Sequence, residues 1–368
     1  MSMEALPQPP ASTPDPAREA RLLQLRREAE TGGRVKGPGV HPPGAPFPKA
    51  SPEDGYYGIP MLKEPQWKWE VPLYFFVGGA AGSAAVVGAM ANWVGRDPEL
   101  RRNARLVAAA GAMISTGLLV ADLGRPERFL NMLRVFKKQS AMSVGAWTLA
   151  AFSTFSGATA FAELVAERFD FAPVRLLGHI SEAFSAALGL PFHNYTGVLI
   201  GATAIPVWNR NVTTLPIHFG MSGLSSAVAI LELLGHNSAA LNMLGIAASA
   251  FETYEGVHLE QRPEAALEPL KHGLSGWITR LGGVLSGPAP LSLRLAAQIS
   301  GSQKMRRAAC WSAIAGSLLT RYGWMQAGAA SARDWRLPLE ILESMPETPE
   351  SRLKPELPQM GALKRASG

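Results

Sequence analysis

The chain is poor in charge and almost free of cysteine. Charged residues make up 17% of its 368 residues, whereas soluble domains carry about 25%. The single cysteine, Cys310, excludes a disulfide framework and any iron–sulfur or zinc site ligated by several cysteines of this chain. If electrons pass through the protein, they therefore do not rest on an iron–sulfur centre of its own.

Common signals and motifs are lacking as well. The N-terminus has no basic region followed by an apolar one, so we expect no cleavable signal peptide. The sequence contains no Walker A loop, no Gly-rich dinucleotide fingerprint and no HExxH motif. These motifs therefore assign no function, and we expect no nucleic-acid partner.

Polar, proline-rich tails make up residues 1–68 and 334–368. Residues 18–30 could form a short amphipathic helix that is either solvated or docked on a partner subunit. Residues 37–52 have the composition of a Pro/Gly linker. We expect the tails to be partly disordered or to bind a partner.

Long runs with almost no charge fill the region between the tails, residues 69–333. A helix needs about 20 mostly apolar residues to cross a bilayer. The pattern therefore predicts an all-α integral membrane protein with about eight transmembrane helices, over 72–94, 104–123, 142–166, 191–208, 214–234, 237–257, 272–293 and 308–330. The seventh helix is weakly indicated, because Arg280 and the GPAP sequence interrupt it. Residues 174–189 are amphipathic and predict a surface or partly buried helix before the fourth span.

Small residues recur along these segments and indicate close helix packing. In lipid they let helix backbones approach one another, so that van der Waals contact holds the bundle together. Two stretches also repeat: YFFVGGAAGSA (74–84) aligns with HFGMSGLSSAV (218–228), and DLGRPE (122–127) aligns with HLEQRPE (258–264). Four helices repeated in the same direction would give two four-helix bundles side by side. A chance match among small residues is the alternative.

Six tryptophans lie near the ends of predicted spans, where an aromatic belt would place them. We expect them to be interface anchors; they are Trp67, Trp69, Trp93, Trp147, Trp208 and Trp324. Lysines and arginines are nearly balanced between the two sides of the membrane. The membrane orientation therefore stays open.

Ionisable residues inside the spans are functional candidates, because charges are costly in lipid. An arginine in the middle of a span, such as Arg280 or Arg321, needs a carboxylate or a water-filled cavity. Glu252 or Asp122 could supply the carboxylate. The candidates for a proton relay or an intramembrane ion pair are Asp122, Arg125, His218, Glu252, Arg280 and Arg321. Glu163, Glu232 and Glu255 lie closer to span ends, and we expect them to reach the headgroups.

The second span ends in a charged segment, LVADLGRPERFLNMLRVF (119–136). Asp122 can pair with Arg125 or Arg128 across one helical turn, and Pro126 ends or bends the helix. The following residues alternate cationic and apolar side chains, which is typical of a segment in the membrane interface. Such a segment could bind lipid phosphates, dock an acidic subunit or frame the mouth of a pocket.

Histidines give little indication of haem. His179 and His193 are 14 residues apart, a spacing found between haem ligands stacked along one helix. Pro191 interrupts the continuous helix that this spacing requires. We therefore expect no haem and no metal site.

Several segments resemble one family. LYFFVGGAAGSAA, DLGRPERFLNMLRVFKKQSAMSVGAW, YTGVLIGATAIPVWN and GSLLTRYGWMQAGAASARD are similar to the NrfD-like membrane subunits of polysulfide-reductase-type complexes, over about residues 69–334. The resemblance implies eight helices in two bundles in the bacterial cytoplasmic membrane. It also implies that the subunit exchanges electrons with a quinone, menaquinone or ubiquinone. The implied partners are a ferredoxin-like iron–sulfur subunit and a molybdopterin or other catalytic subunit.

The resemblance also points to quinone-binding residues. It assigns this role to Tyr195 at the start of the fourth span, and the adjacent His193 and Asn194 can donate hydrogen bonds to the same site. Asp122 is a second contributor. Members of the family can present a histidine and an asparagine on the first span, and this chain has neither there. Tyr74 could replace them, the quinone could bind differently, or the site could be lost.

Two other functions stay open. Arg280, Arg321, Glu252 and Asp122 could form the relay of a proton- or ion-translocating protein. Alternatively, the bundle could anchor soluble subunits without any quinone chemistry. Quinone chemistry and proton movement can also coexist in one subunit.

Overall fold

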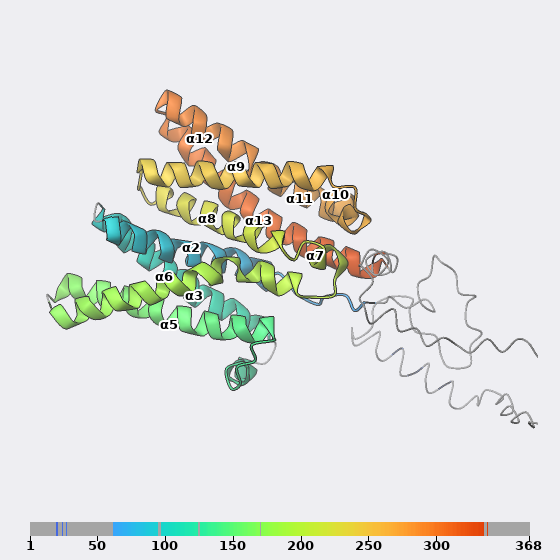
Figure 1. Cartoon of the computed structure of the whole chain (residues 1–368), viewed down its shortest axis with the longest axis horizontal. Coiled ribbons are helices and arrows are strands. Elements are labelled where there is room, and N and C mark those ends of the chain that lie inside the picture. The colour runs from blue at the N-terminus through green and yellow to red at the C-terminus, as the bar shows by residue number, and fades with distance from the viewer. Residues whose placement is uncertain are drawn as a thin grey trace, which may run out of the picture.

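The computed structural model describes residues 62–94, 97–123, 126–169 and 171–334, together with a few isolated positions. Within these ranges the secondary structure is helical (Figure 1). The long helices of the N-terminal half are α2 (Glu70–Val94), α3 (Pro98–Asp122), α5 (Ala141–Arg168) and α6 (Ala172–Gly201). Those of the C-terminal half are α8 (Thr214–Leu233), α9 (Ala239–Gln261), α11 (Gly273–Ser286), α12 (Pro288–Ser300) and α13 (Gln303–Arg333).

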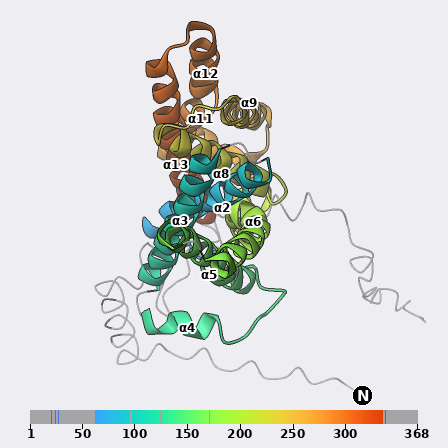
Figure 2. The same ribbon diagram turned by 90° about the vertical axis from the view of Figure 1, so that its left-hand side faces the viewer.

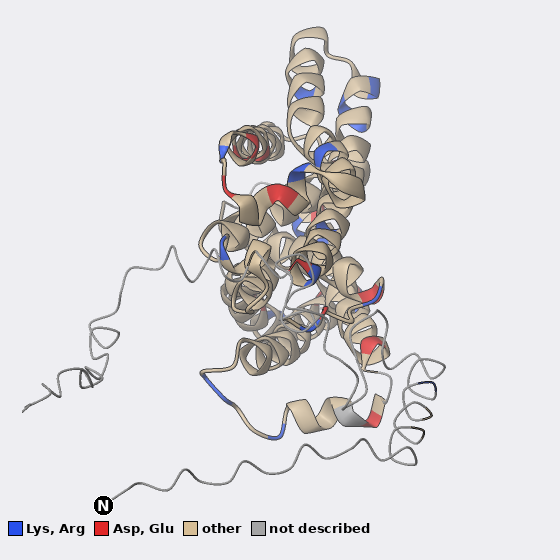
Figure 3. Cartoon of the chain, turned by 90° about the vertical axis from the view of Figure 1, so that its right-hand side faces the viewer, with Lys and Arg blue, Asp and Glu red and all other residues tan. Residues whose placement is uncertain are grey.

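Short helices connect the long ones. They are η1 (Pro126–Arg128), α4 (Phe129–Met132), α7 (Pro206–Asn209), η2 (Ala265–Leu267) and α10 (Glu268–Lys271). Most charges gather in small groups, and the greater part of the ribbon carries none (Figure 3). This distribution agrees with a lipid-embedded body.

The helices form two packed groups that meet along α2 and α8. In the first group α2 packs on α3 and α6, and α5 packs on α3 and α6. In the second group α8 packs on α9 and α13, and α11 and α12 pack on α13. Figure 2 shows α2 and α8 between the two groups. The predicted pair of bundles is present, but the second contains five long helices among the described residues, because the segment expected as the seventh span is divided into α11 and α12.

In the part of the chain that the structure describes, four helices are long and apolar enough to cross a membrane by length and composition. They are α2, α3, α5 and α8. These four correspond to the first, second, third and fifth spans expected from the sequence. The other long helices are shorter, or carry too many charged or weakly apolar residues to qualify on these criteria alone.

One predicted segment boundary was wrong. Residues 174–189 are the first half of α6, and the helix continues through Pro191 to Gly201. Proline removes one backbone hydrogen bond, and helices packed in lipid tolerate this loss. The seventh span is interrupted at GPAP as the sequence indicated: α11 ends at Ser286, and α12 begins at Pro288.

Glycines bring the central helices into contact. A methyl group added to Gly223 on α8 would lie 2.8 Å from the carbonyl oxygen of Gly79 on α2. A methyl group added to Gly189 on α6 would lie 2.6 Å from the carbonyl oxygen of Gly82. Backbone therefore meets backbone at both crossings, and only glycine fits without a shift of the helices.

Two of the six tryptophans are not interface anchors. The Trp208 side chain is fully buried and donates a hydrogen bond of 2.8 Å from Nε1 to the carbonyl oxygen of Trp324, which is itself buried. Trp67 stacks on Trp208 with ring centroids 5.4 Å apart. Trp69, Trp93 and Trp147 are exposed, as expected for a belt. The prediction was wrong for Trp208 and Trp324, because a residue near the end of a predicted span can also lie inside the bundle.

The start of α2 and the end of α13 are held together. The Tyr322 hydroxyl donates a hydrogen bond of 3.1 Å to the carbonyl oxygen of Trp69. Arg333, the last residue of α13, forms an ion pair with Glu64. The two ends of the helical body therefore lie at the same end of the molecule (Figure 1).

We expect the Gly223→Ala variant to be less stable by about 1–3 kcal/mol, because its methyl group forces α8 away from α2. Gly117→Ala is the matched control, because nothing lies within 4 Å of a methyl group at this exposed position of α3. Thermal unfolding in detergent measures both variants. Equal unfolding temperatures for the two variants would show that the α2–α8 crossing is not tightly packed.

Candidate functional site

A pocket of about 590 Å³ lies among α8, α9, α11 and α13. Apolar side chains such as Leu215, Val257, Val284 and Trp324 form much of its wall. Pockets of roughly 300–1,000 Å³ with a few convergent polar groups are typical ligand sites. This pocket is therefore the primary candidate for the functional site.

His218 and Glu252 form the buried side of the pocket. Nδ1 of His218 lies 3.3 Å from Oε1 of Glu252, and Glu252 is only 2% exposed. The hydroxyl of Ser286 donates a hydrogen bond of 3.0 Å to the other carboxylate oxygen. Three helices, α8, α9 and α11, thus bring an imidazole, a carboxylate and a hydroxyl to one place.

Arg321 of α13 lies behind this pair and is fully buried. Its Nη2 donates a hydrogen bond of 2.8 Å to the carbonyl oxygen of Phe219, and its guanidinium carbon lies 3.8 Å from the centre of the Phe219 ring. Arg321 also interacts electrostatically with Glu252. The expectation that Arg321 would find Glu252 as its carboxylate is thus supported by their placement in one cluster, although no direct ion pair joins them in the described part of the chain.

Several polar atoms of this cluster have no hydrogen-bond partner among the described residues. They are both ring nitrogens of His218, Oε1 of Glu252, and Nε and Nη1 of Arg321. Buried polar atoms are nearly always hydrogen-bonded in folded proteins, so each exception needs an explanation. The His218 and Glu252 atoms border the pocket, where a ligand can supply the partner.

Ion pairs surround the pocket on the side of the α9–α10 connection. Glu264 accepts hydrogen bonds from Arg210 and Arg262, and Nη1 of Arg262 donates one of 2.8 Å to Oδ1 of Asn211. Burial raises the pKa of Glu264, but the hydrogen bonds from the two arginines lower it more. The net result holds this pKa below its ordinary value of 4.5.

Arg280 lies at the pocket but does not form a buried pair. It forms an exposed ion pair with Glu260, with Nε 2.7 Å from Oε1. The expectation that Glu252 or Asp122 would be its partner was wrong. Both Arg280 and Glu260 lie on the open side of their helices, so the charge needs no core partner.

The predicted quinone residues of the first bundle are packed into its core. The hydroxyl of Tyr195 donates a hydrogen bond of 2.7 Å to the carbonyl oxygen of Ala141, and its ring lies directly over Gly145. Tyr74 is buried in the main apolar cluster of the core, beside Phe75. His193 lies where α6 crosses α2 and α8, next to Gly82 and Gly220, and Asn194 lies beside Gly220. Their role in quinone binding stays a prediction.

The charged segment after α3 is described only in part. Asp122 is half-buried at the end of α3 and interacts electrostatically with Glu70 and Lys68. Arg125 lies outside the described residues, and the same holds for the side chain of Arg128. Figure 2 shows that α4 stands apart from the bundle, and its residues are not buried.

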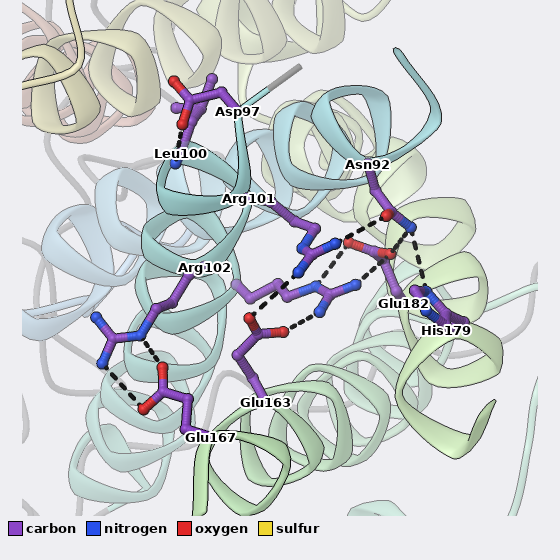
Figure 4. A network of polar contacts seen from close by, with 10 residues as sticks. Asn92, Asp97, Leu100, Arg101, Arg102, Glu163, Glu167, His179 and Glu182 are labelled. Atoms are coloured by element: carbon purple, nitrogen blue, oxygen red, sulfur yellow. Dashed lines mark hydrogen bonds and ion pairs between the residues drawn. The ribbon is translucent and has the colours of Figure 1, made fainter. Parts of the chain in front are cut away.

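Two buried ionic clusters were missed by the sequence analysis. In the first bundle, Arg105 pairs with Glu163 and Glu182 (Figure 4). In the second, Nη2 of Arg294 lies 2.7 Å from Oε2 of Glu232, and both side chains are buried. Glu163 and Glu232 thus do not reach for the headgroups, because each has an arginine partner on a neighbouring helix. Arg105 and Arg294 lie at the edges of predicted spans. A charged residue at such an edge is expected to lie outside the lipid, so the sequence did not indicate that these arginines are buried.

The predicted repeat relates the two bundles. It aligns Tyr74 with His218, and the glycines five residues later, Gly79 and Gly223, contact each other where α2 crosses α8. The two helices also run in the same direction (Figure 1). In this alignment His218 of the second bundle corresponds to Tyr74 of the first.

The described residues contain no group of three or more His, Cys, Asp or Glu side chains that could hold a metal ion. The single cysteine, Cys310, is buried, and its thiol donates a hydrogen bond to Glu232.

Apolar helices of this length and a buried polar cluster define an integral membrane protein with a ligand pocket. Residues 60–331 match the family model described as polysulphide reductase, NrfD, and the chain belongs to the NrfD family. This family consists of membrane subunits of oxidoreductase complexes, which in general partner with iron–sulfur and catalytic subunits. No curated protein sequence matches the chain. The family expected from the sequence is confirmed.

We expect the Glu232→Gln variant to lose about 3–5 kcal/mol of stability, because it leaves the buried Arg294 without its counter-charge. Glu260→Gln is the matched control: it breaks an exposed ion pair, which contributes about 0–1 kcal/mol. Denaturant unfolding in detergent measures both. A loss no larger for Glu232→Gln than for Glu260→Gln would contradict the buried pairing.

The ion pairs of Glu264 predict a dependence of stability on acid. Because its pKa is lowered in the folded state, its contribution is present above the ordinary value of 4.5 and is lost as the pH falls through the folded-state pKa. Unfolding temperatures measured from neutral to acidic pH should therefore fall less steeply for Glu264→Gln than for the unmodified chain. Parallel curves would show that the loop carries no such pair in solution.

Proposed function

We propose that the protein is the quinone-reactive membrane subunit of an oxidoreductase complex, and that the quinone ring binds in the pocket beside His218 and Glu252. One observation carries this proposal. Unpartnered polar atoms of a partly buried imidazole and a buried carboxylate meet at the wall of a largely apolar pocket of about 590 Å³. A quinone has an apolar body and two oxygens that need hydrogen-bond donors, so it fits this arrangement.

The His218–Glu252 pair suits the proton chemistry of a quinone. Reduction of a quinone adds two electrons and two protons, and oxidation of the quinol removes them. An imidazole and a carboxylate within hydrogen-bond reach of the substrate can each transfer one proton. The buried positive charge of Arg321 favours the ionised form of Glu252 once its proton has moved, and Ser286 keeps the carboxylate in place.

The electrons come from, or go to, a partner. We infer an iron–sulfur subunit next to this chain, because the family assembles with such subunits in general. That subunit connects to a catalytic subunit, as in the molybdopterin enzymes suggested by the resemblance. In this scheme the present chain binds the quinone, excludes water and moves protons.

The membrane arrangement that fits this function has eight crossings in the bacterial cytoplasmic membrane. Seven crossings are single helices, namely α2, α3, α5, α6, α8, α9 and α13. The remaining crossing, the seventh along the chain, is the broken helix made of α11 and α12. Such broken helices occur in lipid where they border a cavity. Pro288, the first residue of α12, lines the pocket.

The first bundle is the competing location for the quinone. Tyr195 and Tyr74 lie there, but the Tyr195 hydroxyl is already bonded to Ala141, and its ring fills the space over Gly145. The second bundle offers both the space and the free polar atoms. The repeat explains how His218 can take the place that the family resemblance expects on the first span.

Proton translocation is a second candidate. Buried ionic groups of the second bundle favour it, because Glu232 on α8 and Arg294 on α12 lie on helices that pack against both α9 and α13, which carry Glu252 and Arg321. Such groups mark proton pathways in membrane proteins. Proton flux into liposomes without any quinone would support this candidate, and a chain that only anchors soluble subunits would show neither flux nor quinone binding.

We expect Glu252→Gln in the assembled complex to lower the turnover of quinone about 100-fold or more, because it removes a proton-transferring group. Glu268→Gln is the control, since this exposed glutamate on α10 lies outside the pocket. Tyr195→Phe tests the competing location. The measurements are steady-state quinone kinetics and the dissociation constant of a quinone analogue, with unfolding temperatures to verify folding.

The outcomes separate the two locations. Loss of turnover in Glu252→Gln with normal turnover in Tyr195→Phe supports the pocket of the second bundle. The reverse result moves the quinone to the first bundle. Full turnover in both variants, with no binding of the analogue, contradicts quinone chemistry in this chain.

A further inference from the structure

A polar network that the quinone proposal does not use lies in the first bundle, at the end where α2 ends and α3 begins (Figure 4). Arg105 of α3, only 6% exposed, lies at its centre and donates hydrogen bonds of 2.7 and 2.5 Å to the two carboxylate oxygens of Glu182. It also pairs with Glu163 of α5. Asn92 of α2 donates a hydrogen bond of 2.6 Å to Glu182. Four helices are thus tied together at one point.

A second pocket, of about 220 Å³, opens beside this network. Its cationic lining comes from Arg101, Arg105, Arg175 and His179. Glu163 and Glu167 also line it, but each is already paired: Glu163 with Arg105, and Glu167 with Arg102. The carboxylates are therefore neutralised from within the protein.

One N–H group of Arg101, at Nε, has no hydrogen-bond partner among the described residues. Its Nη1 donates a hydrogen bond of 3.2 Å to Oδ1 of Asn92, and its Nη2 lies 3.6 Å from Glu163. Its Nε is buried. A buried guanidinium N–H without a partner is rare, and a bound anion would satisfy it.

The protonated nitrogen of His179 is fixed by its neighbours. The Asn92 side chain must direct its NH₂ group to the Glu182 carboxylate and its oxygen to Arg101. The same NH₂ group lies 3.3 Å from Nδ1 of His179, so Nδ1 accepts a hydrogen bond. The neutral ring therefore carries its proton on Nε2, which makes His179 a second donor at the pocket.

The position of the pocket suits a lipid. Glu163 and Glu167 lie in the last two turns of α5, an apolar helix long enough to span the membrane, so the pocket is at the level of the headgroups. Large apolar side chains nearby are exposed and can contact acyl chains; they are Leu164, Phe169, Phe171 and Leu176. Basic pockets between membrane helices bind anionic lipid headgroups.

We propose that this pocket binds the phosphate group of an anionic phospholipid, held by Arg101, Arg175 and His179. The lipid would close the polar end of the first bundle while its chains cover the exposed side chains of α5 and α6. A free phosphate ion shares the same chemistry, and the experiment distinguishes the two sources.

The test uses the purified complex after removal of lipid by detergent. Unfolding temperature and native mass spectrometry are measured with added phosphatidylglycerol, phosphatidylcholine or inorganic phosphate. We expect phosphatidylglycerol to raise the unfolding temperature and to remain bound in the mass spectrum. Phosphatidylcholine and inorganic phosphate should give no comparable shift.

Two variants and one control locate the site. Arg175→Gln and Arg101→Gln should each weaken the apparent affinity for phosphatidylglycerol about fivefold or more, as expected for the loss of one cation at a headgroup. Arg175 is exposed, so its variant remains informative if Arg101→Gln fails to fold. Arg134→Gln, an exposed arginine in the loop before α5, should bind normally.

Several results would overturn the proposal. Equal affinity in all three variants would place the lipid elsewhere. An equal response to phosphatidylcholine would reduce the effect to non-specific solvation, and a full response to inorganic phosphate would assign the pocket to a free anion. Loss of a partner subunit from the Arg175→Gln complex, with lipid binding unchanged, would make this surface a protein interface.

Discussion

Every charge buried in this bundle has to find its counter-charge on another helix, because lipid offers no water to solvate it. Arg105 finds Glu163 and Glu182, and Arg294 finds Glu232. Each pairing fixes the rotation and the depth of its helices, since a shift of one residue would separate the partners. The cluster of His218, Glu252 and Arg321 differs from these pairs, because no direct ion pair joins its arginine to its carboxylate among the described residues. Glu232 and Arg294 also keep polar atoms without a hydrogen-bond partner, but those of His218 and Glu252 belong to residues that line the larger pocket. Unpartnered polar atoms beside a pocket are the physical reason to look for a substrate there.

The two bundles share a glycine contact but differ in their surroundings. Gly79 and Gly223 still meet at the crossing of α2 and α8, but the neighbourhood of Tyr74 is filled by aromatic side chains, whereas His218 borders a pocket. One half thus provides rigid packing, and the other provides space and titratable groups. This division lets a site change in one bundle while the other keeps the fold.

The apolar helices could be predicted from the sequence, and the ionic contacts between them could not. Length and low charge were sufficient for α2, α3, α5 and α8, because these properties belong to each segment by itself. The partners of Glu163, Glu232 and Arg280 depend on which helices become neighbours, and local sequence does not specify this. The predictions for Trp208 and Pro191 were wrong for a related reason. Tryptophan prefers the membrane interface and proline ends helices, but packing inside the bundle buries Trp208 and keeps the helix continuous through Pro191. His218 and Glu252 were both named as candidates, but their meeting across α8 and α9 is a property of the fold.

The ion pair between Glu64 and Arg333 has a topological consequence. Together with the hydrogen bond from Tyr322 to Trp69, it joins the residues just before α2 to the C-terminal half of α13, at one end of the helical body. A polypeptide that enters and leaves a bilayer at the same face has traversed it an even number of times. Any partner that contacts both Glu64 and Arg333 must therefore approach this one end of the helical body, and the opposite end is left to the short connections between the described helices.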